Sequence, residues 1–254
     1  RDLEINTGTD LAAMLPKGDR HPNNRPLGPL KPRGRPSGVV CRGGYIIAEY
    51  GDVSASEVTF SVTKSYVSAC AGLAFDAGLI GDLDDPVGRT VTDGGFASVH
   101  NRAITWRQLL QQTSEWEGEL FGIPEWIDRG RTVAERSSET VGGSASRADN
   151  VRPLTQPGTF WEYNDVRVNR AALALLRIFG QPLPKILSDR IMIPIQASTD
   201  WQWHGYTTSW VEVDGHKVQS VSGGAHWGGG LWISTLDQVR FGLLFLRRGL
   251  WADQ

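Results

Sequence analysis

The chain has 254 residues, of which 40% are hydrophobic and 21% charged, and its formal net charge is −2. These proportions are those of an ordinary globular protein, and the length allows one large domain or two interleaved ones. The near-neutral charge gives no electrostatic basis for binding nucleic acid or anionic lipid, and no apolar run reaches the length of a membrane span. We therefore expect neither a nucleic-acid partner nor a membrane segment.

Cysteine and histidine usage also limits the possibilities. The two cysteines, Cys41 and Cys70, are too few for a disulfide framework and form no C-x-x-C pair. The histidines are scattered without the spacing of metal ligands, so we expect no metal and no cofactor. The sequence begins at Arg1 without an apolar leader, which leaves the compartment open, with the cytoplasm slightly favoured.

The first third of the chain reads as a lead-in, a hairpin and a helix. Residues 1–38 hold six prolines spaced so that only a short helix near residues 10–15 can form. Residues 39–50 predict a β-hairpin around Gly43 and Gly44, because two short β-branched and aromatic runs flank the turn. From Ser61 to Ala77, apolar residues recur at helical spacing and Gly78 follows as a stop signal.

The remainder of the chain is mostly helical. Its expected elements, in chain order, are a helix opened by a Thr105–Gln108 capping box, a polar loop over residues 128–156, a helix over 164–179 ending at Gly180, a short helix from Pro184, a hairpin over 211–221 turning at Asp214-Gly215, and a helix capped by Ser234 or Thr235 that ends before Gly249. Strands first and helices later argue against an alternating parallel α/β sheet.

The most informative short motif is Ser61-Val62-Thr63-Lys64, an S-x-x-K tetrad at the start of the first long helix. Residues three apart share a helical face, so the Lys64 amine can reach the Ser61 hydroxyl. A serine becomes a good nucleophile when an adjacent base takes its proton. Taken alone, the tetrad fits equally well a solvated lysine beside a helix-capping serine.

The wider sequence resembles the superfamily of serine β-lactamases and penicillin-binding proteins, especially its class C-like esterase, or CubicO-type, hydrolase branch. The resemblance covers most of the chain, and the blocks that carry it occur in the family's order. They are GGYIIAEYGD, FSVTKS, AGLIGDLDDPV, ITWRQLLQQTS, PGTFWEYND and GGGLWISTLDQVRFG. The order and spacing of these blocks are far more specific than the tetrad.

The resemblance implies roles for individual residues. Ser61 would be the acylated nucleophile and Lys64 its proton-accepting partner, and Tyr163 would match the tyrosine of the family's Y-x-N block, sharing acid–base work with the lysine. An ammonium near a tyrosine favours the ionised phenolate. Asp165 replaces the final Asn of that block. It would hold Lys64 by a charge-assisted bond that raises the lysine pKa, or simply cap the following helix.

Two further residues are candidates for lining the site. Trp116 follows a block that in this family skirts the substrate cleft, although large aromatics mostly fill cores. His226 lies in the only local match to the family's third motif, an H-x-G or K-T-G strand. We prefer to read that stretch as the glycine-rich lead into the last helix. On this reading the third motif lies beyond Gln254, and His226 is a loop residue close to the site.

The expected fold is α+β and β-lactamase/transpeptidase-like, with an antiparallel sheet flanked by helices, a mostly helical region, and C-terminal strands missing from this chain. Residues 1–90 would form the lead-in, hairpin and nucleophile helix, residues 91–234 the helical region with the Y-x-N-like block, and residues 235–254 a returning helix. Hairpin 39–50 has no obvious strand partner later in the chain.

The favoured function is a serine hydrolase that forms an acyl-enzyme with a small ester or amide substrate. A non-catalytic binding or scaffold member of the same fold is the main alternative, motivated by the absent third motif and by Asp165. An acyltransferase and a β-lactamase or peptidase variant remain open. The sequence does not indicate an oligomeric state.

Overall fold

The structure is a computed structural model that describes residues 27–28, 34–130, 151–224 and 230–252. The short helix expected near residues 10–15 and most of the 1–38 lead-in lie outside the described residues, as does the larger part of the 128–156 loop. The described parts of that loop, residues 128–130 and 151–156, contain no helix or strand.

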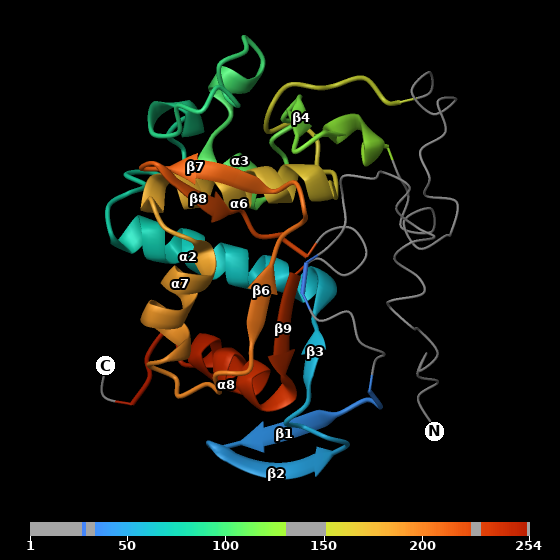
Figure 1. The fold of residues 1–254 in the computed structure, drawn as a ribbon, viewed down its shortest axis with the longest axis vertical. Helices are drawn as coiled ribbons and strands as arrows, with labels where there is room; N and C mark the ends of the chain where they lie inside the picture. Colours follow the sequence, from blue (N-terminus) through green and yellow to red (C-terminus); the bar gives the residue numbers. More distant parts are fainter. Residues whose placement is uncertain (1–26, 29–33, 131–150, 225–229, 253–254) are drawn as a thin grey trace.

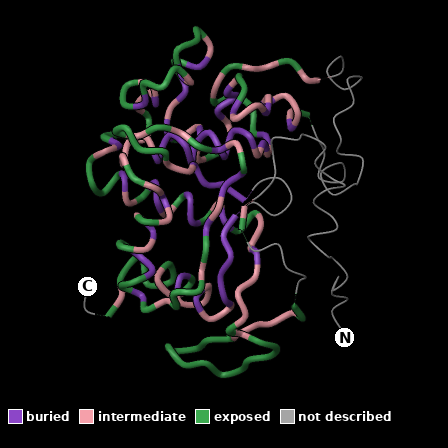
Figure 2. The backbone as a smooth tube through the Cα atoms, in the orientation of Figure 1, coloured by how far each residue is buried: buried purple, intermediate pink, exposed green. Residues whose placement is uncertain are grey.

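The predicted N-terminal hairpin is confirmed as strands β1 (Gly38–Arg42) and β2 (Tyr45–Tyr50), which pair antiparallel. Its turn has positive φ at Gly43 (58°) and Gly44 (86°), the conformation that a tight hairpin turn needs and that glycine adopts most easily. Within the described residues the hairpin pairs with no further strand. It lies at one end of the molecule and is exposed along nearly all of its length (Figures 1 and 2).

A three-stranded antiparallel sheet lies next to the first long helix. Its order is β3 (Ser56–Val58), β9 (Gly230–Ser234), β6 (Gln202–His204), with Val58 and Gln202 both opposite Trp232. Every residue of the central strand β9 is buried. Sequence analysis identified none of these strands, because three to five residues are too few to show a two-residue period.

The helical core is built on α2 (Thr63–Asp76) and α6 (Asp165–Phe179), which cross the middle of the molecule and contact each other (Figure 1). A 3₁₀ turn, η1 (Phe60–Val62), precedes α2. The helix predicted to start at Ser61 therefore starts two residues later. The apolar faces of α2, α6 and α7 (Leu183–Leu187) meet in one buried cluster that includes Tyr66, Cys70 and Leu175.

The capping predictions are largely confirmed. Thr105 opens α3 (Trp106–Leu110) with both reciprocal bonds of a capping box to Gln108. Gly180 ends α6 with φ of 63°. Ser234, and not Thr235, caps α8 (Thr235–Leu246) by accepting a bond from the Asp237 N–H.

The remaining elements are short. They are η2 (Val87–Arg89), η3 (Asn101–Ala103), β4 (Glu119–Leu120), β5 (Ile123–Pro124), η4 (Glu125–Ile127), the π-helical turn η5 (Ser188–Met192), and the hairpin β7 (Trp210–Val213) and β8 (His216–Gln219). This second hairpin turns at the predicted Asp214-Gly215.

The fold is therefore mixed, with antiparallel sheets and helices, as the α+β prediction requires. Across the described ranges no sheet has more than three strands. No helix there is both long and apolar enough to span a lipid bilayer. The division at residues 90 and 234 stays a prediction.

Candidate active site

Ser61 and Lys64 lie at the junction between the 3₁₀ turn and α2. Ser61 is exposed, and the Lys64 Nζ donates to its Oγ at 3.4 Å. The residue before the serine, Phe60, has a φ of 48°, a left-handed conformation that costs a bulky side chain energy. Such a backbone outlier directly before a candidate nucleophile is typical of functional turns.

Tyr163 approaches the same serine from the segment that leads into α6. Its phenolic hydroxyl forms a short hydrogen bond with Ser61 Oγ, across 102 positions of sequence. The Lys64 Nζ also lies 4.6 Å from the centre of the Tyr163 ring. The structure thus brings a hydroxyl, a phenol and an amine together at one point.

Asp165 completes the group by pairing with the lysine, its Oδ1 lying 3.0 Å from Lys64 Nζ with each side chain 16% exposed. Burial by itself would lower the pKa of Lys64, but the charge of Asp165 and the contacts with Tyr163 outweigh it and raise that pKa above its usual 10.5. Lys64 is therefore an ammonium at neutral pH. Asp165 is also the first residue of α6, while the helix cap itself is Asn164.

The segment that carries Tyr163 is held by hydrogen bonds on both sides of that residue. The Glu162 backbone N–H donates to the Gln112 carbonyl at 3.0 Å. The Asn164 N–H donates to the Gln112 side chain at 3.2 Å, and the Asn164 amide donates to the Glu125 carbonyl at 3.0 Å. Asn164 is fully buried and caps α6 by accepting from the Arg167 N–H. Residues from two distant loops thus fix this segment.

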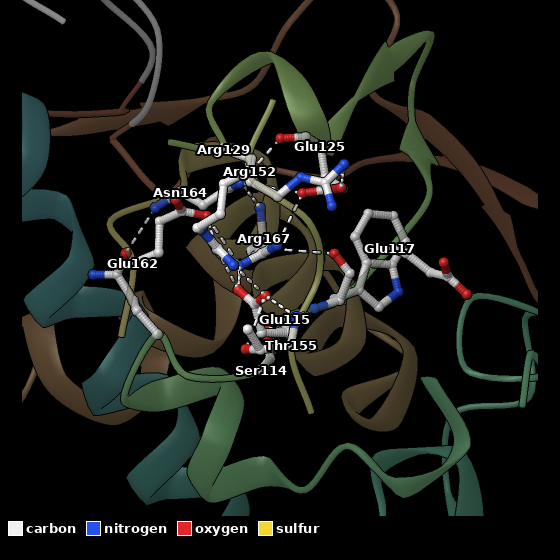
Figure 3. Close-up of polar contacts among 12 residues, drawn as sticks. Ser114, Glu115, Glu117, Glu125, Arg129, Arg152, Thr155, Glu162, Asn164 and Arg167 are labelled. Carbon is white, nitrogen blue, oxygen red and sulfur yellow. Dashed lines mark hydrogen bonds and ion pairs between the residues drawn. The ribbon is translucent and has the colours of Figure 1, made fainter. Parts of the chain in front are cut away.

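Beneath this segment lies a buried group of charged side chains that we call the Arg167 cluster (Figure 3). Its members are Arg152, Arg167, Glu115, Glu125 and Glu162. The Arg167 guanidinium donates to Glu115 at 2.6 Å, to Glu125 at 3.0 Å and to Glu162 at 3.4 Å. Arg152 bridges Glu115 at 2.8 Å and Glu162 at 2.9 Å. All three carboxylates are at most 6% exposed.

The cluster shifts the pKa values of its acids in different directions. Burial would raise the pKa of Glu115, but bonds from Arg152, Arg167 and the Thr155 N–H hold it at about 2. The pKa of Glu125 is raised, because burial outweighs its attraction to Arg167 and Arg129. Glu115 also adopts a φ of 49°. A buried, ionised glutamate in a left-handed conformation persists only where its surroundings over-determine it.

Two glycines bring the chain close to the nucleophile turn. A Cβ on Gly224 would lie 2.1 Å from the Phe60 carbonyl oxygen, and one on Gly230 would lie 2.6 Å from Thr63 Oγ1. Thr63 Oγ1 in turn accepts from the Leu231 N–H at 3.0 Å, which ties β9 to the start of α2. Close backbone approach is therefore the physical reason for glycine at both positions.

The other two candidate residues lie elsewhere. Trp116 is 3% exposed and donates its indole N–H to the Gly95 carbonyl at 2.7 Å. It contributes to the buried core and to one wall of a polar hollow that also contains Glu117 and Arg170. His226 lies outside the described residues. No group of three or more histidine, cysteine, aspartate or glutamate side chains in the described ranges is arranged to hold a metal ion.

Sequence reasoning did not identify the Arg167 cluster. Its members come from four separate stretches of the chain, and no spacing rule connects them. One local signal was present, because Arg167 lies between Val166 and Val168, and Arg170 directly precedes the apolar run 171–176. Charges in such a position are almost always paired when buried.

The mixed arrangement of antiparallel sheets and helices defines a class of fold, the β-lactamase/transpeptidase-like fold. The family model described as Beta-lactamase matches residues 53–253, and the chain belongs to this family. A comparison with curated proteins gave no match.

Several solved structures share the fold at low sequence identity. A D-amino acid amidase from Ochrobactrum anthropi SV3 aligns with a TM-score of 0.56 and 19% identity over 96% of this chain and 72% of its own. A β-lactamase from Mycobacterium bovis aligns with a TM-score of 0.51 and 18% identity, over 83% of this chain and 55% of its own. An octameric penicillin-binding protein homologue from Pyrococcus abyssi aligns with a TM-score of 0.54 and 16% identity, over 84% of this chain and 52% of its own. The chain spans 60% and 59% of matching proteins from Bacteroides dorei and Bacillus anthracis.

Proposed function

We propose that this chain is a serine hydrolase that forms an acyl-enzyme on Ser61. The observation that carries the proposal is the convergence of a phenol and an ammonium on one exposed hydroxyl, since Tyr163 and Lys64 both bond to Ser61 Oγ. A nucleophile within hydrogen-bond reach of a base, which a third group orients, is the arrangement that activates a serine.

The protonation states assign the roles. Lys64 is held as an ammonium by Asp165 and has no free lone pair, so the Tyr163 oxygen is the atom that takes the Ser61 proton. The ammonium close to the ring stabilises negative charge on that oxygen. This refines the sequence-based expectation, in which Lys64 was the proton acceptor and Tyr163 shared its work.

The reaction then proceeds in two halves. Ser61 Oγ attacks the substrate carbonyl carbon while its proton passes to Tyr163, and the Ser61 backbone N–H is one donor to the developing oxyanion. Tyr163 returns the proton to the departing alcohol or amine, leaving an ester on Ser61. A water molecule attacks that ester, gives one proton to Tyr163 and releases the carboxylic acid, and the tyrosine returns its proton to Ser61.

Small esters are the favoured substrates, with amides second. Asp165 offsets the positive charge of Lys64, so the ion pair argues against a substrate that needs a cation here to bind its carboxylate, and it leaves the serine–tyrosine bond intact. The amide class is supported by the name of one structural neighbour, an amidase.

A fluorophosphonate probe tests the proposal, since it phosphonylates an activated serine and adds a defined mass. We expect one adduct, located by peptide mass spectrometry at Ser61, and none in Ser61→Ala. Ser65, exposed on the next helical turn, provides the matched control, and Ser65→Ala should be labelled like the parent. An adduct at another residue, or no adduct on a folded chain, would overturn the assignment. An unreactive chain would favour a binding protein on the same fold.

A further inference from the structure

The buried side of the Tyr163 segment carries an inference about how the site is assembled. Glu162, the residue directly before Tyr163, is 6% exposed, and both of its carboxylate oxygens accept hydrogen bonds. One oxygen accepts from the Gly130 N–H at 2.5 Å, and the other from Arg152 at 2.9 Å and Arg167 at 3.4 Å. A single side chain therefore links three separate parts of the fold immediately beside the candidate base.

The cost of this arrangement indicates that it serves more than packing. Burying charged groups costs several kcal/mol per ion, and well-packed apolar residues of similar size often stabilise a core as well or better. The adjoining loop also contains two non-glycine residues with positive φ, Gln112 (57°) and Glu115 (49°), and both bond to the Tyr163 segment or to its anchors. Unfavourable conformations of this kind concentrate at sites where a group must be pre-positioned.

The requirement for pre-positioning follows from the site geometry. Tyr163 bonds to Ser61 through its phenolic hydroxyl, and its own backbone lies on a segment without helix or strand before Asp165. Proton transfer needs the two oxygens within hydrogen-bond distance, and a misplacement of about 1 Å can lower a rate about 10²-fold. Something must fix the backbone on each side of Tyr163.

We propose that Glu162 is a positioning residue, whose carboxylate, clamped by Arg152, Arg167 and the Gly130 N–H, fixes the Tyr163 phenol against Ser61. Asn164 fixes the other side through Gln112 and Glu125. The inference rests on the proposed function and adds to it the part of the fold that aligns the base. Glu162 touches neither substrate nor Ser61, so it acts through Tyr163.

The test compares two carboxylates that face buried arginines of the same helix. Glu162→Gln removes the charge opposite Arg167 and keeps the shape. Asp93→Asn does the same opposite Arg170, whose guanidinium bonds to Asp93 at 2.9 Å through Nη1 and lies one turn further along α6. The readout is phosphonylation of Ser61 at saturating and limiting probe, which separates the rate constant kinact from the binding constant KI. Circular dichroism establishes that each variant is folded at the assay temperature.

We expect Glu162→Gln to lower kinact at least tenfold with KI within twofold of the parent, and Asp93→Asn to leave both within twofold. A purely structural role would change stability in both variants and kinact in neither, and that result would overturn the inference. If the parent is not labelled at all, the proposed function fails first.

Should Glu162→Gln not fold, Glu162→Asp gives a milder perturbation, because it keeps the charge and shortens the side chain that bonds to Gly130, Arg152 and Arg167. We expect a three- to tenfold fall in kinact with unchanged KI. An unchanged kinact in this folded variant would overturn the inference equally.

Discussion

The segment Glu162–Asp165 has two sides that differ in how they treat charge. On the site side, Tyr163 and Asp165 face one ammonium, with the Lys64 and Asp165 side chains each 16% exposed. On the core side, Glu162 and Asn164 bond to a cluster in which each of the three buried carboxylates has two guanidinium partners. The site side thus contains one ion pair, whereas the core side contains a network in which each charge has more than one partner.

The difference separates the two tasks of the segment. A charge in a one-to-one pair leaves only one partner uncompensated when it is altered, so its chemistry can be changed with fewer structural consequences. A charge within a buried network cannot be removed without leaving its partners uncompensated. We therefore expect substitutions on the site side to change rates and pH profiles, and substitutions on the core side to change stability as well.

The largest effect is expected on the site side, at Lys64. Lys64→Met removes the ammonium that lies beside Tyr163 and donates to Ser61 Oγ, and we expect Ser61 phosphonylation to slow about 10³-fold, or about 4 kcal/mol. Lys185→Met is the control, because Lys185 pairs with Asp189 at 2.6 Å on the surface. A Lys64→Met rate within tenfold of the parent would show that the site works without this ammonium.

On the core side, Glu115→Gln should lower the free energy of unfolding at pH 7 by about 3 kcal/mol, measured by urea titration, because two arginines lose a buried partner. The folded pKa of about 2 lies below the ordinary 4.5. The stabilisation is therefore present above pH 4.5 and is lost as the pH falls from 4.5 toward 2. The free energy of unfolding of Glu115→Gln should therefore fall less steeply between pH 4.5 and 2 than that of the parent. An equal dependence on pH in both proteins would contradict the lowered pKa of Glu115.

A smaller effect is expected for Asp165→Asn. Without the Asp165 charge, burial dominates and the pKa of Lys64 falls, so the ammonium is lost at lower pH. The basic limb of the pH–rate profile for phosphonylation should move toward lower pH by about one unit. Unfolding free energy, measured in parallel, should change little. An unmoved basic limb would mean that Lys64 does not titrate in the reaction.

The smallest effect is expected at an exposed ion pair, which serves as the reference for the substitutions at the site and in the core. Asp189→Asn breaks an exposed ion pair, in which the two side chains are 58% and 46% exposed. We expect a change below about 0.5 kcal/mol in unfolding free energy and no change in labelling. A larger change in the free energy of unfolding would show that an exposed ion pair in this chain contributes as much to stability as a buried one.

Sequence reasoning predicted those parts of the fold that depend on local physics. The Thr105 capping box, the Gly43-Gly44 turn and the Gly180 stop each rest on a few adjacent residues, and the structure confirms them. Ser61 and Lys64 are three residues apart, so their proximity was also predictable. Tyr163 was found only through the family resemblance, because no local pattern connects it with Ser61.

The rest depends on long-range contacts. Strand β9 pairs with β3 across more than 170 residues, and its five residues show no pattern that distinguishes a strand. The Arg167 cluster joins loops whose charged residues look like ordinary surface groups in the sequence. Only the folded chain shows that Glu115, Glu125 and Glu162 share one guanidinium.

The glycines beside the nucleophile turn affect how mutational data on this chain should be interpreted. A side chain at Gly224 would collide with backbone atoms of Phe60, and one at Gly230 would collide with Thr63. A saturation library scored for activity would thus mark both positions as intolerant, with the same profile as Ser61. Their intolerance would come from space alone, so ranking residues by sensitivity would mix groups that perform chemistry with groups that only make room for it.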